Sequence, residues 1–334
     1  MVLILRRGTR NRWTHLSENF QNTRIPVIDV AKGLGIVLVV IGHTKLPTIA
    51  MNIIYAFHVP LFFVLSGMVF SDGKSFANIM YSKIRTLLVP YYFFGIFVTL
   101  ALYMHNNVST TYQIYEFIVF GTGYNSALWF IAHLFVLTLY AQFIVKFSNK
   151  TTLYILLMLH LIIGLKFFEL EISSMWRLDL LPLSFSFFIA GYLFKEQIIN
   201  KITSIKWGGV IVVFVIFLTS IYFNLTHHSF ADSSYGQFLD LPLNYLVASV
   251  SGILLTLFVS SKLVKFRFFH FIGQHTIVIL STHQFVPMLL TTFYISINID
   301  MPSILHRILS VVLIYCLIIY TDKYARFIIG RVRS

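Results

Sequence analysis

Ten long apolar runs dominate the sequence, and each has close to the roughly 17–25 residues that a helix needs to cross a bilayer. Charged residues make up only 11% of the chain and the mean hydropathy is +0.81, whereas a soluble domain carries about 25% charged residues. The runs cover residues 27–44, 52–70, 86–104, 127–146, 151–168, 179–195, 208–224, 242–260, 275–295 and 303–322. The sequence therefore predicts an all-α integral membrane protein, a bundle of about ten transmembrane helices.

The basic residues predict how this bundle is oriented, because Lys and Arg are enriched in cytoplasmic loops. With the N-terminus inside, 20 of the 25 Lys and Arg residues face the cytoplasm. Four lie on the opposite side, at Lys45, Lys166, Arg177 and Arg307, and Lys32 lies within the first run. We expect both termini to be cytoplasmic, with a basic tail over 1–24, a membrane domain over 25–325 and a short basic tail over 326–334.

Charge and cysteine content narrow the functional classes. The net charge of +13 would favour nucleic-acid binding in a soluble protein, but here the membrane topology explains it, so we expect no nucleic-acid partner. The single cysteine, Cys316, permits no disulfide within one chain. Twelve histidines are present, but none has the spacing of a known ligand motif, so we predict no metal site.

Four charged or imidazole side chains lie within the first two apolar runs: Asp29, Lys32, His43 and His58. Such groups are costly inside a bilayer and are candidates for a functional site. On one α-helix the first three share a face, and Lys32 lies roughly 16 Å along the axis from His43. Imidazoles titrate near neutrality and can move protons. The alternatives are an Asp29–Lys32 pair at the membrane boundary and two histidines that bridge helices by hydrogen bonds.

Further candidates lie along the chain. Lys83 and Arg85 precede the third run, where they could bind phosphate or simply anchor the helix on the positive side. The Ser66-Gly67 pair favours a close helix contact over a nucleophilic serine. Trp129 is typical of an interfacial anchor. Trp129, His133 and His283 join Ser66 as candidates to line an acceptor path or pore.

In order along the chain, several of these residues resemble the motifs of the acyltransferase 3 family of membrane acyltransferases, which includes bacterial O-acetyltransferases of surface polysaccharides. Residues 28–36 read IDVAKGLGI and are followed by His43, and residues 57–67 read FHVPLFFVLSG. Arg85 then precedes Pro90-Tyr91, and Trp129-Phe130 and His283 follow. Lys32 stands where the family usually has Arg, so its positive charge is kept while the planar donor fork is lost.

The resemblance implies an enzyme of the bacterial cytoplasmic (inner) membrane. It would move an acyl group, usually acetyl, from cytoplasmic acyl-CoA to a hydroxyl of a cell-surface or lipid-linked glycan. Acetyl-CoA is then a co-substrate and not a permanently bound cofactor. Lys32, Lys83 and Arg85 would hold its phosphates, and Asp29 would hold Lys32 or orient a neighbouring group. His43 would be the general base or a transient acyl carrier, with direct transfer favoured, and His58 would share the proton chemistry.

The alternative function is a transporter or flippase for lipid-linked sugars without acyl transfer. Ten helices with buried histidines and charges suit a substrate path across the membrane. Transporters, however, often carry internal repeats or paired helices broken by Gly or Pro, and the sequence shows no such pairing. Turnover of acyl-CoA separates the two functions, because a flippase would show none.

Overall fold

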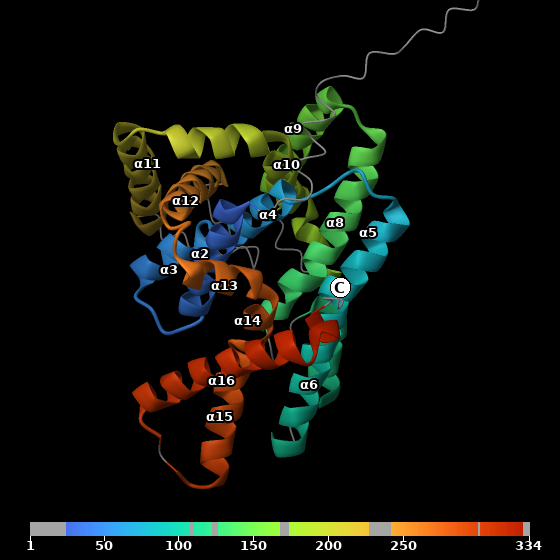
Figure 1. The fold of residues 1–334 in the computed structure, drawn as a ribbon, viewed down its shortest axis with the longest axis vertical. Coiled ribbons are helices and arrows are strands. Elements are labelled where there is room, and N and C mark those ends of the chain that lie inside the picture. Colours follow the sequence, from blue (N-terminus) through green and yellow to red (C-terminus); the bar gives the residue numbers. More distant parts are fainter. Residues whose placement is uncertain are drawn as a thin grey trace, which may run out of the picture.

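The computed structural model describes residues 25–106, 110–121, 126–167, 174–226, 242–299 and 301–329. Within these residues every regular element is a helix (Figure 1), which confirms the all-α prediction. In Figure 1, α11 (Trp207–Thr226) lies at the top left with α12 (Pro242–Lys262) beside it. There, α4 (His58–Met68) lies to the right of α12, and α2 (Pro26–Gly42) lies below α12 and above the C-terminal helices at the bottom.

Eight segments among the described residues are long and apolar enough to cross a membrane. They are Thr48–Met68, Phe76–Leu100, Trp129–Phe147, Met175–Ile202, Trp207–Thr226, Pro242–Lys262, Thr276–Ser296 and Ser303–Lys323. Each matches a predicted run. The other two predicted runs also form helices, α2 with 17 residues and α9 (Lys150–Phe167) with 18, but neither is among those eight. The ten-span topology and the cytoplasmic termini therefore stay predictions.

The second and third predicted spans differ in detail from the sequence expectation. The second span is broken between α3 (Thr48–Tyr55) and α4, so His58 begins a helix instead of lying inside one. The third starts earlier than predicted, because α5 (Phe76–Lys83) is capped by the Ser75 hydroxyl, which accepts a hydrogen bond from the Asn78 N–H at 3.3 Å. It continues through a π-helical turn, η1 (Ile84–Leu88), into α6 (Val89–Asn106).

The remaining helices complete the bundle. They are α7 (Thr110–Phe120), η2 (Ser126–Leu128), α8 (Trp129–Phe147), η4 (Met175–Leu180), α10 (Leu181–Ser204), α13 (Arg267–Gln274), α14 (Thr276–Thr282), α15 (Phe285–Ser296), α16 (Ser303–Lys323) and η5 (Arg326–Ile329). The short η5 packs against η1 and α6 and buries Ile328, so this part of the predicted C-terminal tail is folded onto the bundle.

Small residues let the central helices approach closely, as is common in membrane bundles. At the crossing of α4 and α10, a Cβ on Gly67 would overlap the Phe188 carbonyl oxygen, and one on Gly191 would overlap the Val64 carbonyl oxygen. This bears out the expected close helix contact at Gly67. The same crossing is part of the main apolar core.

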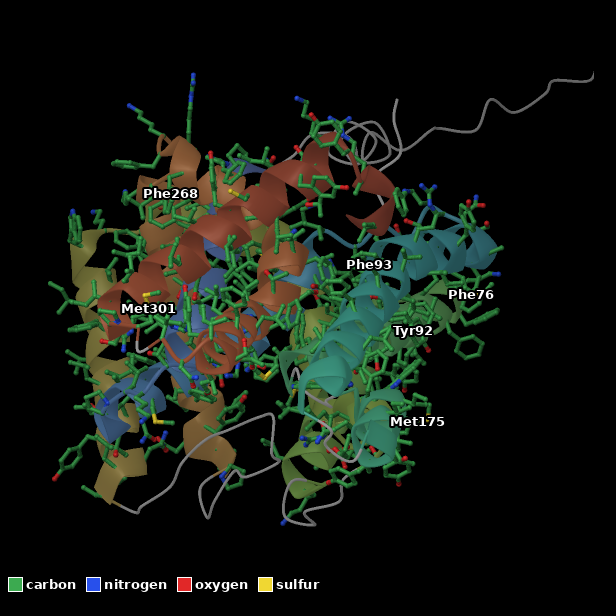
Figure 2. All side chains as sticks on the ribbon, turned by 90° about the horizontal axis from the view of Figure 1, so that it is seen from below. Phe76, Tyr92, Phe93, Met175, Phe268 and Met301 are labelled. Carbon is green, nitrogen blue, oxygen red and sulfur yellow. The ribbon has the colours of Figure 1, made fainter. Side chains whose placement is uncertain are left out.

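Large apolar side chains also cover the outside of the molecule. Tyr92, Phe93 and Phe268 project from the ribbon in Figure 2, and Phe268 is 63% exposed. Soluble monomers rarely expose contiguous apolar surface of this kind. A lipid-facing surface accounts for it, because hydrocarbon is the solvent for the outside of a membrane bundle.

Candidate functional site

A cavity of about 360 Å³ brings together residues that are far apart in the sequence. Six of the sequence-predicted site residues line it: Lys32, His43, His58, Ser66, Lys83 and Trp129. Much of the remaining wall is apolar and includes Phe62, Phe130 and Leu134. The cavity therefore combines cationic and imidazole groups with a largely apolar passage, the usual composition of a small-molecule site.

Two lysines from different helices supply positive charge to this cavity. Lys32 comes from α2, and Lys83 comes from the end of α5, where the π-turn η1 begins. Lys32 is close enough to repel the Lys83 ammonium group electrostatically. Two adjacent cations with mainly apolar surroundings form a site that suits an anion. Arg85 does not line the cavity, and its guanidinium lies 5.5 Å from the centre of the Tyr81 ring.

His43 follows the last residue of α2 and is accessible to solvent. The Gln284 side-chain amide donates a hydrogen bond from Nε2 to His43 Nδ1 at 2.9 Å. The ring of His283 lies against the ring of His43, with 5.1 Å between their centres. His283 and Gln284 occupy the break between α14 and α15 within the ninth predicted span. His283 thus meets the site through His43 without lining the cavity itself.

His58 is held more tightly, at the start of α4, and is only 5% exposed. Its Nδ1 donates to the Ile54 carbonyl oxygen at 2.9 Å. The Tyr55 ring packs edge-on against it at 4.9 Å, and the Tyr55 hydroxyl donates to the Gly42 carbonyl oxygen at 3.2 Å. His58 is also within electrostatic range of His43. The two imidazoles therefore face one cavity in different surroundings.

Trp129 and Ser66 are the remaining sequence-predicted residues that line the cavity. Trp129 is buried at the start of α8, and the Arg177 guanidinium lies 5.9 Å from its ring centre. Arg177 is itself buried and paired with Asp179, at 2.9 Å from Nη2 to Oδ2. The distribution of Lys and Arg predicts Arg177 on the outer side but gives no signal for this pair.

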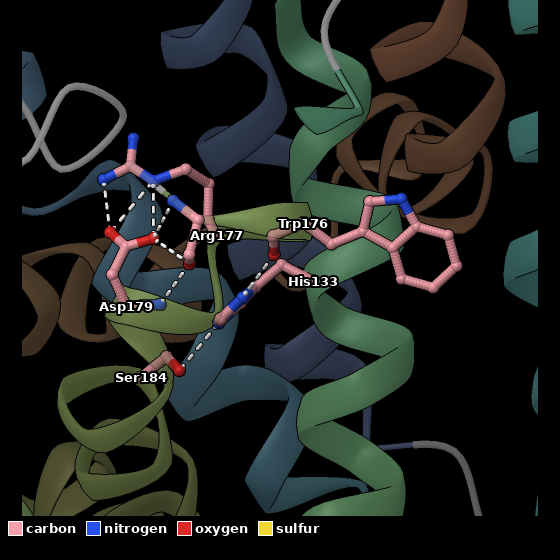
Figure 3. A network of polar contacts seen from close by, with 6 residues as sticks. His133, Trp176, Arg177, Asp179 and Ser184 are labelled. Atoms are coloured by element: carbon pink, nitrogen blue, oxygen red, sulfur yellow. Dashed lines mark hydrogen bonds and ion pairs between the residues drawn. The ribbon is translucent and has the colours of Figure 1, made fainter. Parts of the chain in front are cut away.

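His133 belongs to a neighbouring polar network and does not line the cavity (Figure 3). Its Nδ1 donates to the Trp176 carbonyl oxygen at 3.2 Å, and its Nε2 accepts from the Ser184 hydroxyl at 2.8 Å. Trp176 and Arg177 have φ angles of 48° and 56°, a left-handed conformation that is strained for bulky side chains. His133 thus holds a strained turn of η4 against α8 and α10.

Asp29 is also not among the cavity-lining residues, although it precedes Lys32 by one helical turn. Its carbonyl group lies against Gly273 of α13, where α2 and α13 pack closely. The role expected for Asp29 in holding Lys32 stays a prediction. Conversely, sequence reasoning missed Tyr55 and Gln284. Gln284 had a usable signal, because it is a polar side chain beside His283 inside an apolar run.

Comparison with known proteins gives one result. The model of the acyltransferase 3 family, described as an acyltransferase domain, matches residues 25–322. This match covers nearly the whole chain and includes every helix that lines the cavity. No curated protein and no solved structure matches the chain.

Proposed function

Because the chain belongs to the acyltransferase 3 family, we propose that it transfers an acetyl group from cytoplasmic acetyl-CoA to a hydroxyl of a cell-surface or lipid-linked glycan. The enzyme works in the cytoplasmic membrane of a bacterium. The observation that carries this proposal is the single cavity that holds two lysines and two histidines. The proposed donor rests on the chemistry of the cavity, and the proposed glycan acceptor rests on the resemblance to the family's O-acetyltransferases of surface polysaccharides.

The two lysines suit the donor. Coenzyme A carries phosphate groups at one end and a thioester at the end of a long, thin pantetheine arm. Lysine binds phosphate as a point charge, and Lys32 and Lys83 both line the cavity. Lys32 and His43 are separated by roughly 16 Å of helix rise, a span that the pantetheine arm can bridge. Phosphates at the lysines then place the thioester beside the imidazoles.

The histidines suit the reaction. The acceptor oxygen forms a bond to the thioester carbonyl carbon and gives up its proton to an imidazole. The carbon–sulfur bond breaks, and the thiolate sulfur receives that proton. The products are an acyl ester and free CoA, so the step needs no other reactant. Proton transfer to and from a positioned imidazole typically increases the rate of such a reaction by about 10²–10⁴-fold.

The proposal is tested with inverted membrane vesicles that contain the protein and the host's glycan. Acetyl-CoA labelled in its acetyl group is added, and label is followed into lipid-linked or polymeric glycan. We expect transfer by the wild type and loss in His43→Ala, with His270→Ala as a control because His270 does not line the cavity. No transfer by folded wild-type protein would contradict the proposal and favour the transporter function.

A further inference from the structure

The two cavity histidines are held by hydrogen bonds of opposite direction. Building on the proposed acyl transfer, we propose that Gln284 and the Ile54 carbonyl fix opposite tautomers, making His58 the general base and His43 a hydrogen-bond donor. This assignment differs from the sequence expectation, in which His43 takes the proton. It gives Gln284 the role of a positioning residue.

The tautomer of His58 follows from its partner. A carbonyl oxygen can only accept a hydrogen bond, so the 2.9 Å contact with Ile54 requires a proton on His58 Nδ1. In the neutral ring Nε2 then carries a lone pair. Tyr55 packs against the ring, which restricts its rotation. His58 therefore offers a proton acceptor in the cavity that it lines.

The hydrogen bond from Gln284 fixes the opposite tautomer on His43. The Gln284 amide donates to His43 Nδ1, so this nitrogen is the acceptor and the proton of the neutral ring is on Nε2. His283 supports the arrangement from one side. Its own Nδ1 donates to the Leu280 carbonyl oxygen at 2.9 Å, and its ring rests against that of His43. His43 thus presents an N–H group where a base would present a lone pair.

These two groups divide the reaction between them. His58 Nε2 takes the acceptor's hydroxyl proton as the oxygen bonds to the thioester carbon. Negative charge develops on the thioester oxygen, which receives a hydrogen bond from His43 Nε2–H. Donors that meet such charge are among the largest contributions to catalysis. When the carbon–sulfur bond breaks, the proton on His58 passes to sulfur, and His43 keeps its proton throughout.

Glutamine substitutions separate a donor from a base, because an amide can donate a hydrogen bond but does not take up a proton near neutral pH. We expect His43→Gln to retain kcat within about tenfold of wild type, whereas His43→Ala and His58→Gln each lose about 100-fold or more. His270→Gln is the matched control outside the cavity. A His43→Gln variant as inactive as His43→Ala, together with an active His58→Gln, would overturn the assignment.

Gln284→Glu tests the positioning role directly. A carboxylate accepts a hydrogen bond from His43 Nδ1–H, which reverses the tautomer of the neutral ring and removes the Nε2–H donor. We expect kcat to fall by about 10²-fold, as when an oxyanion donor is lost, with little change in the KM for acetyl-CoA. Gln197→Glu is the matched control, because Gln197 lies outside this cavity. A Gln284→Glu variant at least as active as wild type would contradict the proposal.

Nitrogen NMR of ¹⁵N-histidine-labelled protein reads the tautomers without activity. We expect a protonated Nε2 on His43 and a protonated Nδ1 on His58, with the His43 assignment reversed in Gln284→Glu. The opposite tautomers in the wild type would overturn the assignment even if transfer is observed. The expected tautomers in a protein without transfer would instead refute the acyl-transfer function and leave the tautomer assignment standing.

Discussion

Lys32 and Lys83 line the same cavity from two different helices, and Lys32 repels the Lys83 ammonium group. Their positions bring like charges together at one site, so a bound anion would relieve the repulsion. This relationship connects the fold to the proposed donor, because the phosphate-bearing part of acyl-CoA supplies such an anion.

Replacing either lysine by alanine should weaken donor binding. We expect Lys32→Ala and Lys83→Ala each to raise the KM for acetyl-CoA about tenfold, equivalent to about 1.4 kcal/mol, with a smaller effect on kcat. Lys32→Arg should be tolerated because it keeps the charge. Steady-state kinetics checks this, with Lys150→Ala as a control outside the cavity. An unchanged KM in both alanine variants would mean that the lysines serve only as anchors.

The helix crossing at Gly67 should not accept a methyl group. In Gly67→Ala the added Cβ meets the Phe188 backbone, so we expect a loss of about 1–3 kcal/mol in stability. Gly208→Ala is the matched control, because nothing lies within 4 Å of a Cβ there. Thermal unfolding in detergent compares the two. Equal melting temperatures would show that the helices can separate slightly at no cost.

Ser66 reports whether acyl-CoA occupies the cavity. In a Cys316→Ser background, Ser66→Cys places the only thiol in the cavity wall. We expect a small maleimide to modify this thiol. Acetyl-CoA at a concentration about tenfold or more above its Kd should slow the modification by at least about tenfold, because it would occupy most of the cavities. Thr151→Cys, an exposed position outside the cavity, should react at the same rate with or without acetyl-CoA. Equal rates at Ser66→Cys would contradict binding in this cavity.

The orientation of the bundle predicted from the basic residues is open to direct measurement. In the same background we expect a membrane-impermeant maleimide to label Lys45→Cys from outside intact cells. Lys150→Cys should react only after the membrane is opened, because the distribution of Lys and Arg places it inside. The reverse pattern would invert the topology.

Sequence reasoning predicted the spans well because apolar length is a local property. Among the described residues, each of the ten predicted runs overlaps a helix, although the second and the ninth are each broken into two. It was less accurate where short-range geometry decides the outcome. The Ser75 cap extends the third span towards the N-terminus and brings Lys83 inside a helix. The break before His58 had a usable signal in Pro60, because proline is tolerated in the first turn of a helix and α4 begins two residues before it.

The site was predictable to the extent that its residues are costly in a membrane. Lys32, His43 and His58 stood out for that reason, and all three line the cavity. Their partners could not be predicted in the same way. Gln284 meets His43 across 241 positions of sequence, and only the packing of α14 and α15 beside the end of α2 brings them together. His133 was predicted to line an acceptor path or pore, yet its hydrogen bonds hold it in a separate network.

The π-turn η1 has a consequence for how the cationic end of the cavity tolerates insertions and deletions. A π-turn holds one residue more than the α-helical turn it replaces, and such turns are frequent at functional sites. Removing one residue between Ile84 and Leu88 would restore a regular helix with α5 and α6 still in phase, whereas converting all five residues to α-helix would rotate everything before them by about 100° relative to α6. In the all-α case Lys83 would turn away from the cavity wall that it now lines. The extra residue thus acts as a phase adjustment that keeps a long helix compatible with both its bilayer-facing side and its ligand-facing side.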